Sequence, residues 1–172
     1  IQWAELLNDF DRCKEASAVL QDILDGSHGT IKNTQVMDSL GYSKEALAAR
    51  QRFFLSRADK EKNNRKGERD ALDKALEKYP EEIDTLIAYY HFPGLSPADK
   101  THIVELIEGA LKKLQQRIDR EPDEPNPYNE YAWLVANTEG DLVRATRYSK
   151  RSLELDFDLS LIHISEPTRP PE

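Results

Sequence analysis

The sequence predicts an all-α protein in which antiparallel helical hairpins stack into an array. The composition favours helices, because only 7 of the 172 residues are glycine and 33% are charged. The chain also repeats one closing segment: residues 76–80 read LEKYP, residues 118–122 read IDREP, and residues 153–157 read LELDF. The spacings between these closings are 42 and 35 residues. A repeat of this length is typical of one hairpin of two helices.

Charge and residue content disfavour several classes of partner. A formal net charge of −8 argues against nucleic acid, whose phosphate backbone attracts basic surfaces. No window approaches the roughly 20 apolar residues that a membrane-spanning helix needs. We therefore expect a protein or peptide partner, neutral or basic rather than acidic, with no nucleic acid and no membrane insertion. The single cysteine, Cys13, is expected to pack as a small hydrophobic residue.

Both ends of the chain are expected to be unusual. The first residue is Ile rather than Met, so residues 1–158 are predicted to be a helical repeat domain truncated at both ends. Residues 159–169 read LSLIHISEPTR and resemble the translated end of a transposon-based sequencing adapter. We interpret residues 159–172 as a non-native or disordered tail. The alternative is a genuine proline-rich tail.

The first half of the chain predicts two hairpins. The first hairpin is formed by two short amphipathic stretches that are separated near residues 9–11, and Gly26 and Gly29 end the second stretch. The second hairpin is expected to turn at Gly41 and to rise again from Ser43, a favourable N-cap residue. This rising helix is expected to continue into the charged run of residues 57–69, which we interpret as a solvated face or loop.

The second half predicts longer helices. Residues 81–91 form one helix, and the Ser-Pro pair at 96–97 signals the start of another that reaches about Arg120. Residues 121–127 contain three prolines and predict an extended connection, because a residue before proline is steered away from the helix. The expected last hairpin consists of two helices, residues 128–137 and residues 142–155. The whole chain is expected to hold about nine helices.

The last hairpin resembles the tetratricopeptide repeat, in which aromatic, apolar and small residues recur over about 34 residues. The positions that carry this resemblance are Tyr128, Tyr131, Ala132, Val135, Ala145, Ser149, Ser152 and Phe157. Five of these eight positions match the family pattern. Ser149 replaces an aromatic residue, Phe157 replaces a proline, and the turn between the helices holds one extra residue.

Two other segments share the resemblance. The first hairpin fits through Trp3, Ala4, Leu7, Ala16, Leu20 and Leu24. Residues 80–122 fit more loosely, through Leu86, Tyr89, Ala110 and Leu114. In that segment Tyr90 stands where the family usually has a small residue. Overall the resemblance covers about residues 3–158.

The resemblance implies an α-solenoid with a right-handed superhelix and a concave groove that binds peptides or partner domains. The first helix of each hairpin would line that groove. The candidate groove residues are Asp84, Ile87, His91, Asn126, Asn129, Trp133 and Asn137. Asn129 and Trp133 are the candidates we favour most. The Asn amide can hydrogen-bond to the backbone of an extended peptide, and the Trp ring offers an apolar surface for its side chains. The alternative is that Trp133 packs against a following hairpin.

The sequence predicts no catalytic, cofactor or metal site. His28, His91 and His102 have neither helical pair spacing nor a suitable set of neighbouring ligands. Acidic clusters are expected to stabilise helix starts. Gly109, which is not at a predicted helix end, is interpreted as a point of close helix packing. We therefore expect a non-catalytic interaction module. The alternative is a helical arm appended to an enzyme whose catalytic domain lies outside this segment.

Overall fold

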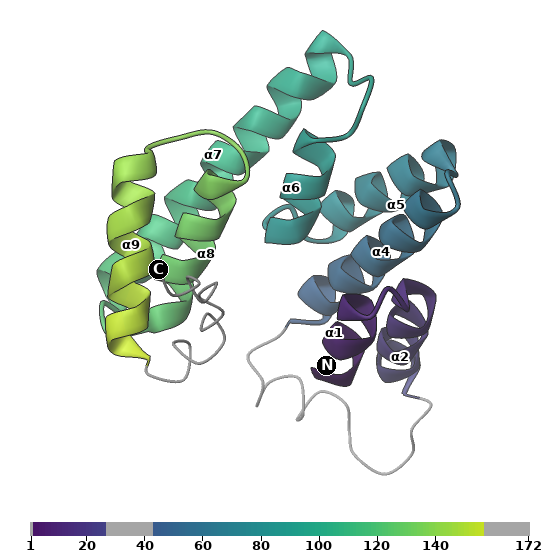
Figure 1. The fold of residues 1–172 in the computed structure, drawn as a ribbon, viewed down its shortest axis with the longest axis horizontal. Coiled ribbons are helices and arrows are strands. Elements are labelled where there is room, and N and C mark those ends of the chain that lie inside the picture. The colour runs from purple at the N-terminus through teal and green to yellow at the C-terminus, as the bar shows by residue number, and fades with distance from the viewer. Residues whose placement is uncertain (1, 27–42, 157–172) are drawn as a thin grey trace, which may run out of the picture. The chain divides into compact units, whose positions relative to one another are not determined.

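The computed structural model describes residues 2–26 and 43–156 (Figure 1). These residues form eight α-helices and no strand, which confirms the all-α class. The helices are α1 (Gln2–Asp9), α2 (Cys13–Asp25), α4 (Lys44–Glu61), α5 (Arg65–Lys78), α6 (Ile83–Tyr90), α7 (Pro97–Arg120), α8 (Pro125–Ala136) and α9 (Leu142–Leu155). The predicted helix end at Gly29, the predicted turn at Gly41, the closing position Phe157 and the predicted tail over residues 159–172 lie outside the described residues.

The chain divides into two compact units, residues 1–107 and 108–172. In the first unit α1 packs on α2, α2 on α4, α4 on α5, and α6 on both α4 and α5. In the second unit α8 packs on α9. The predicted first hairpin, α1 with α2, and the predicted last hairpin, α8 with α9, are therefore packed pairs of helices.

Local capping signals place several helix ends where the sequence predicts them. Gly26 ends α2 in the left-handed conformation, with φ of 73°. The Ser43 hydroxyl accepts a hydrogen bond from the Ala46 amide at 3.0 Å and begins α4. Ser96 begins α7, because its hydroxyl accepts a hydrogen bond from the Asp99 amide at 3.1 Å. These three predictions are confirmed.

The charged run over residues 57–69 contains a break between two helices, α4 and α5. The helix rising from Ser43 enters the run but ends at Glu61, and α5 begins four residues later. Asn63 adopts a left-handed conformation, with φ of 53°, which asparagine tolerates better than most residues. The side chain of Asn64 then accepts a hydrogen bond from the Gly67 amide at 3.1 Å and caps α5. The Asn-Asn pair is therefore a turn between two helices.

The prediction of an extended connection over residues 121–127 is wrong at its end. α8 begins at Pro125 and includes Pro127. Proline is tolerated there because the first amides of a helix have no partner within the helix, so a missing N–H costs little. The preference of Asn126 for extended backbone is outweighed by burial of Pro127 and Tyr128.

The predicted apolar stripes form the core of each unit. Ala16, Leu20 and Leu72 are buried in the first unit, and Ala110, Leu114 and Ala145 in the second. Gly109 is different, because it lies on an exposed part of α7. A Cβ atom there would meet no described atom within 4 Å, so the predicted close packing at Gly109 is wrong.

One partly buried guanidinium joins three helices of the first unit. Arg50 of α4 donates hydrogen bonds to Glu5 of α1 at 2.9 and 2.8 Å. It also pairs with Glu82 at 2.7 Å and with Asp84. The Arg50 side chain is 19% exposed, so these contacts are partly shielded from water. Burial raises the pKa of Glu82, and the positive charge of Arg50 opposes that rise.

A second ion pair holds the start of α7 against α5. Asp99 Oδ1 accepts a hydrogen bond from Arg69 Nη2 at 2.8 Å, and Oδ2 accepts one from the Ser96 hydroxyl at 2.7 Å. These hydrogen bonds from Arg69 and Ser96 lower the pKa of Asp99 to about 2. Arg69 also contacts Asp73 at 3.2 Å, so two carboxylates share its charge.

Asp99 is predicted to give the fold a specific sensitivity to acid. Its folded pKa is below the ordinary value, so its stabilising effect is present above about pH 4 and is lost as the pH falls toward 2. Asp99→Asn should therefore lower the thermal midpoint at pH 7. The gap between the two midpoints should shrink as the pH falls from 5 to 3. A gap that is constant over this range would contradict the assignment.

Ala145 is predicted to set the distance between α8 and α9. It is buried on α9, so Ala145→Leu should overpack this contact and destabilise the protein by about 1 to 3 kcal/mol in urea titration. Thr146→Leu is the matched control, because Thr146 is the next residue of α9 and is exposed. The control should change stability by less than about 0.5 kcal/mol. Equal effects of the two substitutions would show that Ala145 is not at a packed contact.

Candidate functional site

Four of the seven predicted groove residues follow one face of α8 in the second unit. Asn126, Asn129 and Trp133 are three and four positions apart, and Asn137 follows four positions later as the C-cap. Asn126 and Asn129 are exposed, and the Trp133 side chain is 52% exposed. Asn137 has a structural role, because its side-chain amide donates a hydrogen bond to the Trp133 carbonyl at 2.9 Å. We call Asn126, Asn129 and Trp133 the α8 face.

The other three predicted residues belong to the first unit. Asp84 pairs with Arg50, so part of its charge is neutralised within the fold. Ile87 is half-buried on α6. His91 caps the C-terminus of α6 and packs edge to face on Tyr90, with ring centroids 5.2 Å apart. The seven residues are therefore divided between two units, and neither unit holds the complete predicted set.

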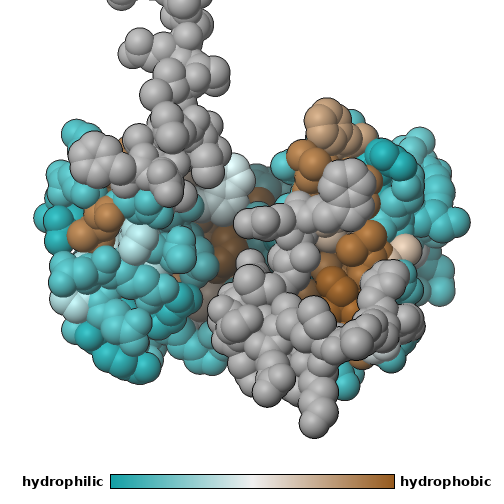
Figure 2. Space-filling model, turned by 90° about the horizontal axis from the view of Figure 1, so that it is seen from below, coloured by the Kyte–Doolittle hydropathy of each residue, from teal (hydrophilic) through white to brown (hydrophobic). Residues whose placement is uncertain are grey.

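The α8 face combines an apolar surface with amide groups. Asn side chains carry both donors and acceptors, and the Trp133 ring offers a broad apolar area. Figure 2 shows a surface on which hydrophilic side chains predominate and apolar side chains gather in separate patches. Among the described residues, the large apolar side chains that are exposed include Leu6, Phe10, Trp133, Leu142 and Val143. Three of these five belong to the helix pair α8 and α9.

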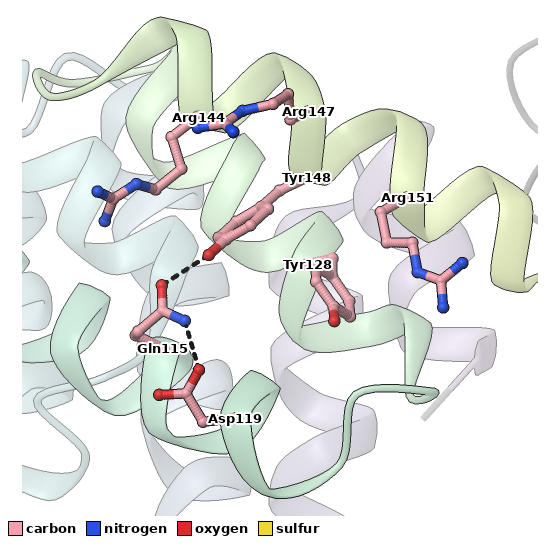
Figure 3. A pocket seen from close by; sticks show the side chains of 7 residues that line it. All are labelled: Gln115, Asp119, Tyr128, Arg144, Arg147, Tyr148 and Arg151. Carbon is pink, nitrogen blue, oxygen red and sulfur yellow. Dashed lines mark hydrogen bonds between the residues drawn. The ribbon is translucent and has the colours of Figure 1, made fainter.

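The structure also forms a pocket of about 600 Å³ in the second unit (Figure 3). Side chains of α7, α8 and α9 line it: Gln115, Asp119, Tyr128, Arg144, Arg147, Tyr148 and Arg151. We call it the arginine pocket. None of these residues is among the predicted site residues. One feature of the sequence indicates this site: the three arginines are three and four residues apart, a spacing that places them on one face of α9.

Tyr148 fixes one wall of the arginine pocket. Its ring packs edge to face on Tyr128 and Tyr131, with centroids 5.2 and 5.0 Å apart. Its hydroxyl donates a hydrogen bond to Gln115 Oε1 at 2.7 Å, and Gln115 Nε2 donates one to Asp119 Oδ1 at 2.8 Å. This chain of hydrogen bonds, visible in Figure 3, links α9 to α7. The aromatic contact is therefore supplied by Tyr148 rather than by position 149.

Within residues 2–26 and 43–156, no group of three His, Cys, Asp or Glu side chains could hold a metal ion. No helix in these ranges is both long and apolar enough to cross a membrane. Cys13 is buried, and its burial raises the pKa of the thiol to about 11, which disfavours the reactive thiolate.

Comparison with protein-family models, curated proteins and solved structures found no match for this chain. The functional argument therefore depends on the geometry of the α8 face and of the arginine pocket.

Proposed function

We propose that this chain is a non-catalytic interaction module built from tetratricopeptide-like hairpins, and that its α8 face binds an extended peptide. Burial supports the first part, because most positions that carry the resemblance in the last hairpin are shielded from solvent: Tyr128, Tyr131, Ala132, Val135, Ala145 and Ser152. The packing of consecutive helices also agrees with hairpin repeats stacked as a solenoid. No catalytic constellation is part of the proposal.

The exposure of Trp133 is the observation that carries the proposal. Its neighbours Leu134 and Val135 are buried, whereas Trp133 is 52% exposed. Leaving so large an apolar surface exposed costs free energy that binding a partner recovers. Aromatic side chains of this kind often dominate the binding energy of an interface.

The asparagines give the α8 face its specificity for an extended chain. Asn129 lies one helical turn before Trp133, and Asn126 lies nearly one turn before Asn129. A peptide backbone that crosses the tryptophan ring needs partners for its N–H and C=O groups, and the amides offer both. A neutral or basic peptide fits the acidic balance of the chain best.

Substitution of Trp133 tests this proposal. Peptides selected from a displayed random library on the 172-residue chain should bind Trp133→Ala at least about thirtyfold more weakly, as expected for loss of a central aromatic residue. Trp133→Phe should keep part of the affinity. The measurement is the dissociation constant by titration calorimetry, with circular dichroism to confirm that the helices are unchanged.

Leu142→Ala is the matched control, because Leu142 is another exposed apolar residue of the same unit. It should leave the dissociation constant within about twofold of the original. If Trp133→Ala unfolds α8, Trp133 is part of the core, as packing on a further hairpin would require. If folding and affinity both persist, the peptide binds elsewhere and the α8 face is not the site.

A further inference from the structure

The arginine pocket is a separate feature from the α8 face. Tyr128 lines the pocket, and Trp133 lies five positions later on the same helix, which is about 140° around its axis. The two surfaces therefore point in different directions from α8. A role for the pocket is independent of peptide binding at Trp133.

The pocket is basic in an acidic protein. Its lining carries three arginines and one carboxylate, Asp119, for a formal charge of +2, whereas the whole chain carries −8. Arg144, Arg147 and Arg151 all come from α9 and line the pocket, and their side chains are spread along this helix (Figure 3). Like charges on one helix face repel each other. An anion in the pocket removes that repulsion.

Little within the described part of the chain neutralises these arginines. Arg147 makes no ion pair there. Arg151 pairs with Asp123 at 3.6 Å and with Glu154 at 3.4 Å, and both carboxylates are largely exposed. Arg144 pairs with Asp141 at 3.7 Å, again in solvent. Such exposed pairs contribute little free energy, so Arg147 and Arg151 remain available to a ligand. Arg144 also interacts with the Tyr131 side chain, which raises the pKa of its guanidinium.

The opposite wall offers hydrogen-bond acceptors. Gln115 and Asp119 come from α7, and the hydrogen bond from Gln115 uses only Oδ1 of Asp119. The second carboxylate oxygen can accept hydrogen bonds from hydroxyl groups of a ligand. The rings of Tyr128 and Tyr148 lie between this wall and the arginines in Figure 3 and give the pocket a partly apolar floor.

We propose that the arginine pocket binds a small phosphate monoester that carries free hydroxyl groups. Arg147 and Arg151 hold the phosphate, and Asp119 accepts hydrogen bonds from the hydroxyl groups. The charges agree, because a phosphate monoester carries about −1.5 to −2 at neutral pH and guanidinium forks bind it through paired hydrogen bonds. A volume of about 600 Å³ is also in the range of small-molecule sites.

Ribose 5-phosphate, inorganic phosphate and ribose are suitable probes, titrated into the 172-residue chain at constant ionic strength in a buffer without phosphate. Ribose 5-phosphate should bind in a saturable way and more tightly than inorganic phosphate, and ribose should not bind. Arg147→Gln should weaken the binding of ribose 5-phosphate by at least about tenfold. Asp119→Asn should weaken the binding of ribose 5-phosphate but leave the binding of inorganic phosphate unchanged. If Arg147→Gln is poorly folded, Arg151→Gln tests the same loss of one guanidinium group from the pocket.

Lys150→Gln is the matched control, since it removes one positive charge from the exposed surface of α9 without touching the pocket lining. It should change the dissociation constant by less than about twofold. Absence of saturable binding would overturn the proposal. So would an equal loss in Lys150→Gln and Arg147→Gln, which would indicate attraction by net charge alone. Trp133→Ala should bind ribose 5-phosphate normally, so this result is independent of the peptide experiment.

Discussion

The structure depends on one constraint: the short helices in the described part of the chain cannot bury their apolar faces alone. α1 and α6 have eight residues each, and isolated helices shorter than about 12 residues are marginal in water. Each is therefore stable only against a neighbour, α1 against α2 and α6 against α4 and α5. The pairing of consecutive helices, and the small residues that let them approach, follow from this requirement.

Close packing of short helices also brings charged groups together, and Arg50 shows the consequence. Its guanidinium lies within about 5 Å of the centres of two rings, Phe53 at 5.1 Å and Phe54 at 5.3 Å, and pairs with three carboxylates. A charge in such surroundings is tolerated only when it is fully paired, and removal of a partner is costly. The cluster therefore links α1, α4 and α6, because one guanidinium contacts a carboxylate at α1 and two at the start of α6.

Features that depend on local sequence could be predicted, and features that depend on distant residues could not. Ser43 and Ser96 are recognisable because an N-cap acts on amides three residues away. The Arg50 cluster joins residues that are 32 to 45 positions apart, and nothing in the local sequence indicates that they meet. The start of α8 at Pro125 does not follow from the local restriction before proline, because burial of the first turn outweighs that restriction.

The candidate sites show the same division. The face of α8 could be predicted from spacing alone, because residues three and four apart on one helix must share a side. The arginine pocket could not, because its floor is formed when Tyr148 meets Gln115, a residue 33 positions earlier on another helix. Its three arginines are visible in the sequence as a regular stripe. Only the packing of α9 on α8 and its hydrogen bond to α7 turn that stripe into the side of a pocket.

The central claim is that neighbouring helices hold each other in place, with Arg50 as the point where three of them meet. Amide hydrogen exchange in Arg50→Gln tests it most directly, with Arg52→Gln on the same helix as the control. The account predicts that α1, α4 and α6 lose protection together by at least about tenfold in Arg50→Gln, and by less than about twofold in the control. Loss of protection confined to α4, with α1 and α6 unchanged, would contradict it.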